Sequence, residues 1–199
     1  MERLVIIDNG HGAETPGKCS PDGRVREYSW TREIAKRIET ELKKTGVNVI
    51  RIVPEERDVS LTERVRRINN ICKKNGAQNV CLVSVHVNAA GNGGWRTARG
   101  WSGWVFTRSS TNSKRLAQLL YYEAEKRKLL GNRSIPTNKY WTANFYILRY
   151  TDCPAVLTEN LFQDNREDVA YLLSEEGKRA IVDLHVEAIT KYLGEMEMA

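Results

Sequence analysis

Residues 80–90 read Val-Cys-Leu-Val-Ser-Val-His-Val-Asn-Ala-Ala, an apolar run rich in β-branched residues that ends in His86 and Asn88. A run of this length between polar segments predicts a buried parallel strand. Ligands of open α/β sheets bind at the carboxyl ends of such strands. His86 and Asn88 therefore stand where a functional site is expected.

Two further predicted strands also end in residues with polar chemistry. Residues 4–8 run into an Asn-Gly-His-Gly segment that contains His11, and residues 154–158 run into Glu159. A single histidine after a strand is more often an ordinary hydrogen-bonded residue. However, the chain has only three histidines, and two of them follow strands. One edge of the predicted sheet thus receives two imidazoles and a carboxylate.

The remaining elements follow from hydrophobic periodicity, which changes repeatedly between strand and helix spacing. Helices are predicted over residues 29–42, from Ser60 to about Lys74, over 113–128 and over 175–192, and strands over 47–53, 104–107 and 145–148, with a polar loop at 131–142. No linker, repeat or change in composition marks a second domain. We expect one α/β domain over residues 1–199.

The net charge is +6, which favours polyanionic partners such as nucleic acid or the anionic bacterial wall. The basic residues are scattered, so an ordinary solvated surface is an equal alternative. No apolar stretch approaches the roughly 20 residues needed to cross a bilayer, and no signal peptide is visible. We therefore expect synthesis in the cytoplasm. The four cysteines form no Cys-x-x-Cys pair, so a structural zinc knot is not expected.

Several other residues have two possible interpretations. Glu27 precedes the first helix, where a carboxylate is either a ligand or a partner of the helix dipole. Arg64 opposes the dipole in the first turn of its helix, so it is either a surface residue without a role or a functional one. The tryptophans of the segment after Asn88 either form a wall for a flat or sugar-bearing ligand or fill the core; they are Trp95, Trp101 and Trp104. In the polar loop, Arg133, Asn138 and Lys139 are expected to be solvated, with contact to an acidic substrate as the alternative.

Together, the two histidines and two carboxylates suit one kind of chemistry. A catalytic zinc ion takes three protein ligands from histidine and carboxylate side chains and keeps a fourth position for water. His11, Glu27 and His86 supply that set, and Glu159 remains to move protons. The predicted reaction is hydrolysis of an amide. His185 lies inside a helix with Ile189 four residues later, so we interpret it as structural.

The chain also resembles the zinc-dependent N-acetylmuramoyl-L-alanine amidases of the amidase 3 class. The motifs that carry the resemblance follow in order from about Leu4 to Leu193: Asp8-Asn9-Gly10-His11-Gly12, Glu27, Asp58…Leu61…Arg64, Ser84-Val85-His86-Val87-Asn88-Ala89, Pro154-Ala155-Val156-Leu157-Thr158-Glu159-Asn160 and Asn165. Asn9 departs from the family, which commonly has proline there. The loops after His11 and Asn88 are also long.

The resemblance implies a three-layer fold with a mostly parallel sheet of about six strands flanked by helices. It implies that His11, Glu27 and His86 bind zinc and that Glu159 is the general base and acid. The bond cut would join N-acetylmuramic acid to the L-alanine of the peptidoglycan stem peptide. Asn88 and Arg64 are the candidate substrate-binding residues. We expect a monomer that acts on the cell wall as a released lysin or a leader-trimmed exported enzyme, with no nucleic-acid partner and no transmembrane segment.

Two alternatives remain from the sequence alone. One is another zinc amidohydrolase or peptidase, because the ligands determine the reaction type better than the substrate. The other is a non-enzymatic module that binds the wall or nucleic acid through its charge and tryptophans. A binding module has no need of the spare carboxylate of Glu159, which favours an enzyme.

Overall fold

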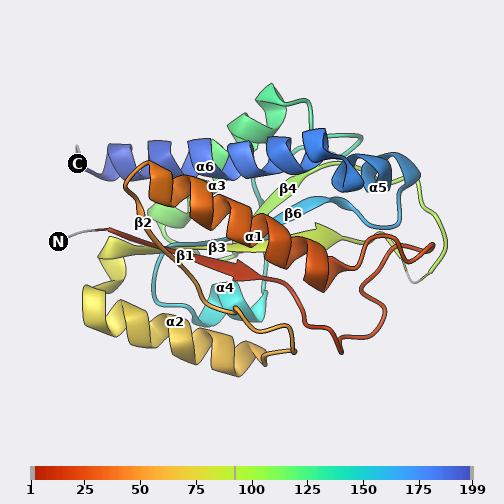
Figure 1. Cartoon of the computed structure of the whole chain (residues 1–199). Helices are drawn as coiled ribbons and strands as arrows, with labels where there is room; N and C mark the ends of the chain where they lie inside the picture. The colour runs from red at the N-terminus through yellow and green to blue at the C-terminus, as the bar shows by residue number, and fades with distance from the viewer. Residues whose placement is uncertain (1–2, 92, 198–199) are drawn as a thin grey trace.

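A computed structural model describes residues 3–91 and 93–197 and shows a six-stranded sheet with helices on both faces (Figure 1). The strands are β1 (Leu4–Asn9), β2 (Asn48–Arg51), β3 (Val80–Asn88), β4 (Ser102–Phe106), β5 (Trp141–Ala143) and β6 (Ala155–Phe162). The helices are α1 (Glu27–Lys44), α2 (Leu61–Asn75), α3 (Thr111–Lys126), α4 (Tyr146–Tyr150), α5 (Arg166–Leu173) and α6 (Glu175–Glu197), with a 3-10 turn at Ala77–Asn79.

The strands are ordered β2-β1-β3-β6-β4-β5. The first four of these run parallel, whereas β4 is antiparallel to β6 and β5 is parallel to β4. The fold class predicted from the sequence, a three-layer α/β fold with a mostly parallel sheet of about six strands, is confirmed.

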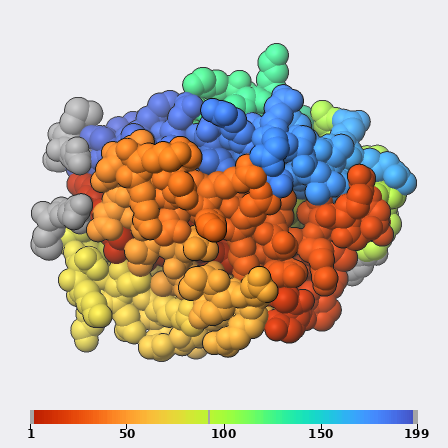
Figure 2. Space-filling view, in the orientation of Figure 1, coloured from red at the N-terminus to blue at the C-terminus, as the bar shows by residue number. Residues whose placement is uncertain are grey.

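Alternate residues of the central strands enter two separate cores. In β1, Val5 and Ile7 pack under α1, α3, α5 and α6, while Leu4 and Ile6 pack under α2 and α4. This alternation follows from the two-residue side-chain period of a strand that is covered on both faces. Figure 2 shows residues of α1 (orange) and α6 (blue), which cover one face of the sheet, and of α2 (yellow), which covers the other, at the surface seen in this view.

One predicted element is wrong. Residues 145–148 were expected to form a strand, but helix α4 occupies Tyr146–Tyr150, and the edge strand β5 lies at Trp141–Ala143 inside the predicted loop. A short apolar run does not distinguish a strand from a buried helical turn. Here the adjacent residues Ile147 and Leu148 both pack into the second core. Neighbouring residues of a helical turn can do so, whereas neighbouring residues of a strand point to opposite faces.

The carboxyl ends of β1, β3 and β6 meet at one edge of the sheet. The register places His86 of β3 beside Glu159 of β6, and Glu159 beside Ser102 at the start of β4. Because β4 and β5 run in the opposite direction, the described residues that lead into them, 89–91, 93–101 and 131–140, approach the same edge. Among the described residues, no helix combines the length and the apolar character needed to cross a bilayer.

Candidate active site

His11 follows β1 in a loop that the backbone holds tightly. Its φ of 58° lies in the left-handed region, which is uncommon for a residue with a side chain. The N–H of the preceding residue, Gly10, donates to Val85 O at 2.9 Å. A Cβ at Gly10 would lie 2.4 Å from His86 Nδ1, so only glycine lets the two histidine-bearing segments approach this closely.

Glu27 is the first residue of α1, and its side chain reaches between the two histidines. Its Oε1 lies 3.1 Å from His86 Nδ1 and accepts the N–H of Val87 at 3.0 Å, while its Oε2 lies 3.4 Å from His11 Nε2. The ligand atoms of His11, Glu27 and His86 all lie within 4.8 Å of one another. The structure thus brings together the three predicted ligands, and this cluster offers a site for a metal ion.

Two of the three side chains, His11 and Glu27, are held in the protonation state that binds a cation. Burial lowers the pKa of His11 to about 4, so its imidazole is neutral near pH 7. Burial alone would raise the pKa of Glu27, but the hydrogen bond and charge of His86 outweigh it and hold that pKa below its usual value. Burial acts to lower the pKa of His86, and the Glu27 contact raises it overall. A carboxylate with neutral imidazole is the donor set that zinc takes in catalytic sites.

Glu159 lies beside this cluster but not within it. Its Oε2 is buried and has no hydrogen-bond partner among the residues that the structure describes. Burial raises the pKa of Glu159 to about 7, against the opposing charge of His86. A carboxyl group with a pKa near neutrality both accepts and returns a proton readily. The strand that was expected to end before Glu159 continues to Phe162, and the register places Glu159 beside His86.

Arg64 is not a surface residue, which corrects one of the two interpretations of the sequence. Its side chain is 2% exposed and pairs with Asp8 at 2.8 Å. It also donates to the backbone carbonyls of Val59, Asn9 and His11. The guanidinium therefore orients the His11 loop from behind, and its contacts explain the unusual position of the arginine in α2.

Two residues of this scaffold were not singled out from the sequence. Asp8 is buried and accepts a hydrogen bond from Ser84 Oγ at 2.5 Å in addition to the Arg64 pair. Arg32 of α1 donates to His11 O at 2.9 Å. A carboxylate at the end of an otherwise apolar strand was the available signal for Asp8. Arg32 looked like any charged residue on an amphipathic helix.

The predicted tryptophan wall is only partly available to a ligand. Trp101 is fully buried, and its Nε1–H donates to Asn160 Oδ1 at 3.1 Å, so it belongs to the core. Trp104 is half-buried and packs against Trp141 with ring centroids 6.1 Å apart. Trp95 is also half-buried, with the Arg166 guanidinium 4.4 Å from its ring centroid. Of these three tryptophans, Trp95 and Trp104 are therefore the ones that are partly exposed.

Asn88 and His185 occupy different surroundings. The half-buried Asn88 ends β3, and its Oδ1 accepts the N–H of Ala89 at 2.8 Å. His185 is fully buried, with Nε2 3.0 Å from Thr158 Oγ1 and Nδ1 2.7 Å from Ile181 O. Its two ring nitrogens are thus occupied within the core, away from the cleft.

A cleft of about 410 Å³ opens over the cluster. His11, His86 and Glu159 line one side, while α4 and the start of α2 contribute apolar groups such as Tyr146 and the half-exposed Leu61. A polar reacting centre against an apolar wall is typical of a substrate cleft.

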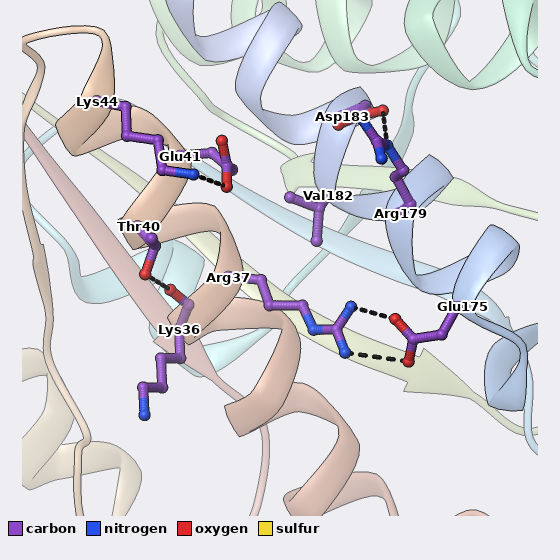
Figure 3. Close-up of a pocket in the computed structure, with 9 residues that line it drawn as sticks. All are labelled: Lys36, Arg37, Thr40, Glu41, Lys44, Glu175, Arg179, Val182 and Asp183. Carbon is purple, nitrogen blue, oxygen red and sulfur yellow. Dashed lines mark hydrogen bonds and ion pairs between the residues drawn. The ribbon is translucent and has the colours of Figure 1, made fainter.

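A larger hollow of about 630 Å³ lies between α1 and α6, remote from this chemistry (Figure 3). Its charged side chains mostly pair with each other; the pairs are Arg37 with Glu175, Lys44 with Glu41 and Arg179 with Asp183. Paired surface charges offer no converging reactive groups. The cleft over His11, His86 and Glu159 is therefore the candidate active site, although the hollow between α1 and α6 is larger.

The chain is similar to several known proteins in sequence and in fold. A family model described as N-acetylmuramoyl-L-alanine amidase matches residues 5–191. The endolysin of Bacillus phage SPP1 is 30% identical over 196 residues, which cover 97% of this chain and 67% of the endolysin. The amidase LytC of Bacillus subtilis is 29% identical over 168 residues, which cover 84% of this chain but only 31% of LytC. The crystal structure of an N-acetylmuramoyl-L-alanine amidase from Clostridium difficile 630 superimposes with a TM-score of 0.82 at 26% identity and covers 97% of each chain.

Proposed function

The chain belongs to the N-acetylmuramoyl-L-alanine amidase family, and from this premise we propose that it is a zinc-dependent peptidoglycan hydrolase. The bond cleaved is the amide between N-acetylmuramic acid and the L-alanine that begins the stem peptide. The observation that carries the proposal is the grouping of His11, Glu27 and His86 within 4.8 Å, with Glu159 beside it. We place its action at the bacterial cell wall, where the positive net charge suits an anionic polymer.

His11, Glu27 and His86 would hold the zinc ion. The chemistry that zinc supplies at such a site is polarisation of the scissile carbonyl and a lowered pKa of water. The chain contributes orientation, because Glu27 is fixed by the Val87 N–H and the His11 loop by Arg64 and Arg32. These contacts hold the three side chains in position before a substrate binds.

Glu159 performs the proton transfers in this proposal. Its buried, unpaired Oε2 accepts a proton from the attacking water and then delivers it to the departing amine of L-alanine. The raised pKa of Glu159, caused by burial, suits both steps near neutral pH. Within the described residues its Oε2 has no hydrogen-bond partner, which is consistent with a group kept free for the reaction.

The decisive experiment is a digest of purified peptidoglycan by the zinc-loaded protein, with and without a chelator. We expect free stem peptides that begin at L-alanine, identified by mass spectrometry, and we expect their release to stop when the metal is removed. Release that survives complete metal removal would overturn zinc dependence. Full zinc occupancy without any stem-peptide release would overturn the substrate.

Variants assign the roles within the site. Glu159→Gln should retain zinc and lose about 10²- to 10⁴-fold in rate, whereas His86→Ala should lose the metal itself. Glu41→Gln, on the outer surface of α1, is a matched control that should change neither zinc content nor rate. Near-normal turnover by Glu159→Gln would remove Glu159 from the mechanism, and full zinc occupancy in His86→Ala would remove that ligand.

A further inference from the structure

Arg133 occupies an unusual position in the segment between α3 and β5. The sequence suggested a solvated side chain, but Arg133 is half-buried, with its guanidinium carbon 5.4 Å from the ring centroid of Trp141 and 5.2 Å from that of Phe162. In the described part of the chain, no carboxylate or carbonyl accepts a hydrogen bond from this guanidinium. The aromatic rings hold the cation while its N–H donors stay free.

The strand directions place Arg133 at the edge of the sheet that carries the active site. β5 is antiparallel to β6, and Trp141 is its first residue, so the segment that precedes Trp141 comes from the edge at which Glu159 lies. Phe162 is three residues after Glu159 on the same strand. The charge of Arg133 also acts on Glu159. It opposes the rise in the pKa of Glu159 that burial causes.

The N–H donors of Arg133 that have no partner lie in one plane. A guanidinium is planar and matches a carboxylate with two parallel N–H···O bonds. Two other arginines that contact the His11 loop, Arg64 and Arg32, donate to Asp8 and to backbone carbonyls. Among these three arginines of the described chain, Arg133 is the one whose guanidinium donors are available to a ligand.

We propose that Arg133 is a specificity residue that binds a carboxylate of the stem peptide. This inference rests on the proposed function. Glu159 returns its proton to the departing amine, so the peptide that carries this amine must extend past Glu159. Arg133 stands on that side, on the aromatic surface of Trp141 and Phe162. An acidic residue close to the new peptide N-terminus would bring its carboxylate to the guanidinium.

The test uses two peptidoglycan preparations that differ only at the second residue of the stem peptide. In one this residue carries a free α-carboxylate, and in the other a carboxamide. We expect the wild-type protein to release stem peptides about 10- to 100-fold faster, in kcat/KM, from the carboxylate form, the range given by charged hydrogen bonds. Arg133→Met should lose this preference with little change on the carboxamide form. Arg133→Lys, which keeps the charge but not the planar fork, should retain part of it.

Arg108→Met is the matched control, because Arg108 also lies over an aromatic ring, Phe106, but faces away from the cleft. It should keep the full preference. Equal release from both forms by the wild-type protein would overturn the inference and leave the amidase function standing, and this reading requires no variant to fold. Equal losses on both forms in Arg133→Met would also overturn it. No release from either form would overturn the proposed function and, with it, this inference.

Discussion

Two arginines at the catalytic edge of the sheet, one on each side, have opposite surroundings. On the side of β1, Arg64 is buried and pairs with Asp8, and its remaining donors bind backbone carbonyls of the His11 loop. On the side of β5, Arg133 lies over two aromatic rings with no polar partner among the described residues. The difference separates an arginine that fixes catalytic groups from one that remains available to a ligand.

The largest expected effect concerns Arg64. Arg64→Met would leave the carboxylate of Asp8 buried without its cation, which typically costs about 3–5 kcal/mol of the free energy of unfolding. Urea unfolding of the metal-free protein measures this loss. We also expect weaker zinc retention, because the His11 loop loses its support. A cost below about 1 kcal/mol would break the contrast between the two arginines.

The second prediction concerns the pH dependence of stability that a buried histidine of the core causes. His185 lies in the core behind Thr158, and burial lowers its pKa to about 4 from 6.5. Between pH 6.5 and pH 4 the unfolded chain takes up this proton and the folded chain does not, so the wild-type protein loses up to about 3 kcal/mol over this window as the pH falls.

His185→Gln should lack that part of the pH dependence. Chemical denaturation of the variant and the wild-type protein at several values of pH tests this, because contributions from other groups cancel in the difference. Parallel curves for the two proteins would show that His185 does not remain neutral in the folded state.

The smallest expected effect on the free energy of unfolding is that of replacing Arg133. Arg133→Met removes two cation–π contacts, one of them to the buried Phe162, and no ion pair, so it should cost only about 0.5–2 kcal/mol in the same urea experiment. A loss as large as that of Arg64→Met would show that Arg133 is structural. A small loss combined with altered substrate preference would sharpen the contrast.

Pattern alone pointed to residues at or near the carboxyl ends of strands. His11 follows β1, while His86 and Glu159 lie just before the ends of β3 and β6, which end at Asn88 and Phe162. Such strand ends of a parallel sheet converge whatever the surrounding detail. The same logic gave the α/β fold. Glu27 was less certain from the residues alone, because a helix N-terminus also accepts a carboxylate for purely electrostatic reasons.

The rest depended on tertiary contacts that sequence spacing does not encode. The position of Arg64 in α2 was a visible anomaly, but its partner Asp8 is 56 residues away along the chain. The run at 145–148 was equally compatible with a strand and a helical turn, and packing onto the second core decided between them. Arg133 belongs to a polar segment whose direction is set only by the antiparallel placement of β5.

The reversal of β4 has a consequence for how the protein can diversify. β3 ends and β4 begins at the same edge, so the connection between them starts and finishes at that edge. Lengthening or replacing part of this connection would remodel the rim of the cleft while the strand register beneath it stays unchanged. Natural variation and protein engineering can therefore alter which wall architectures enter the cleft without rebuilding the groups that perform the reaction.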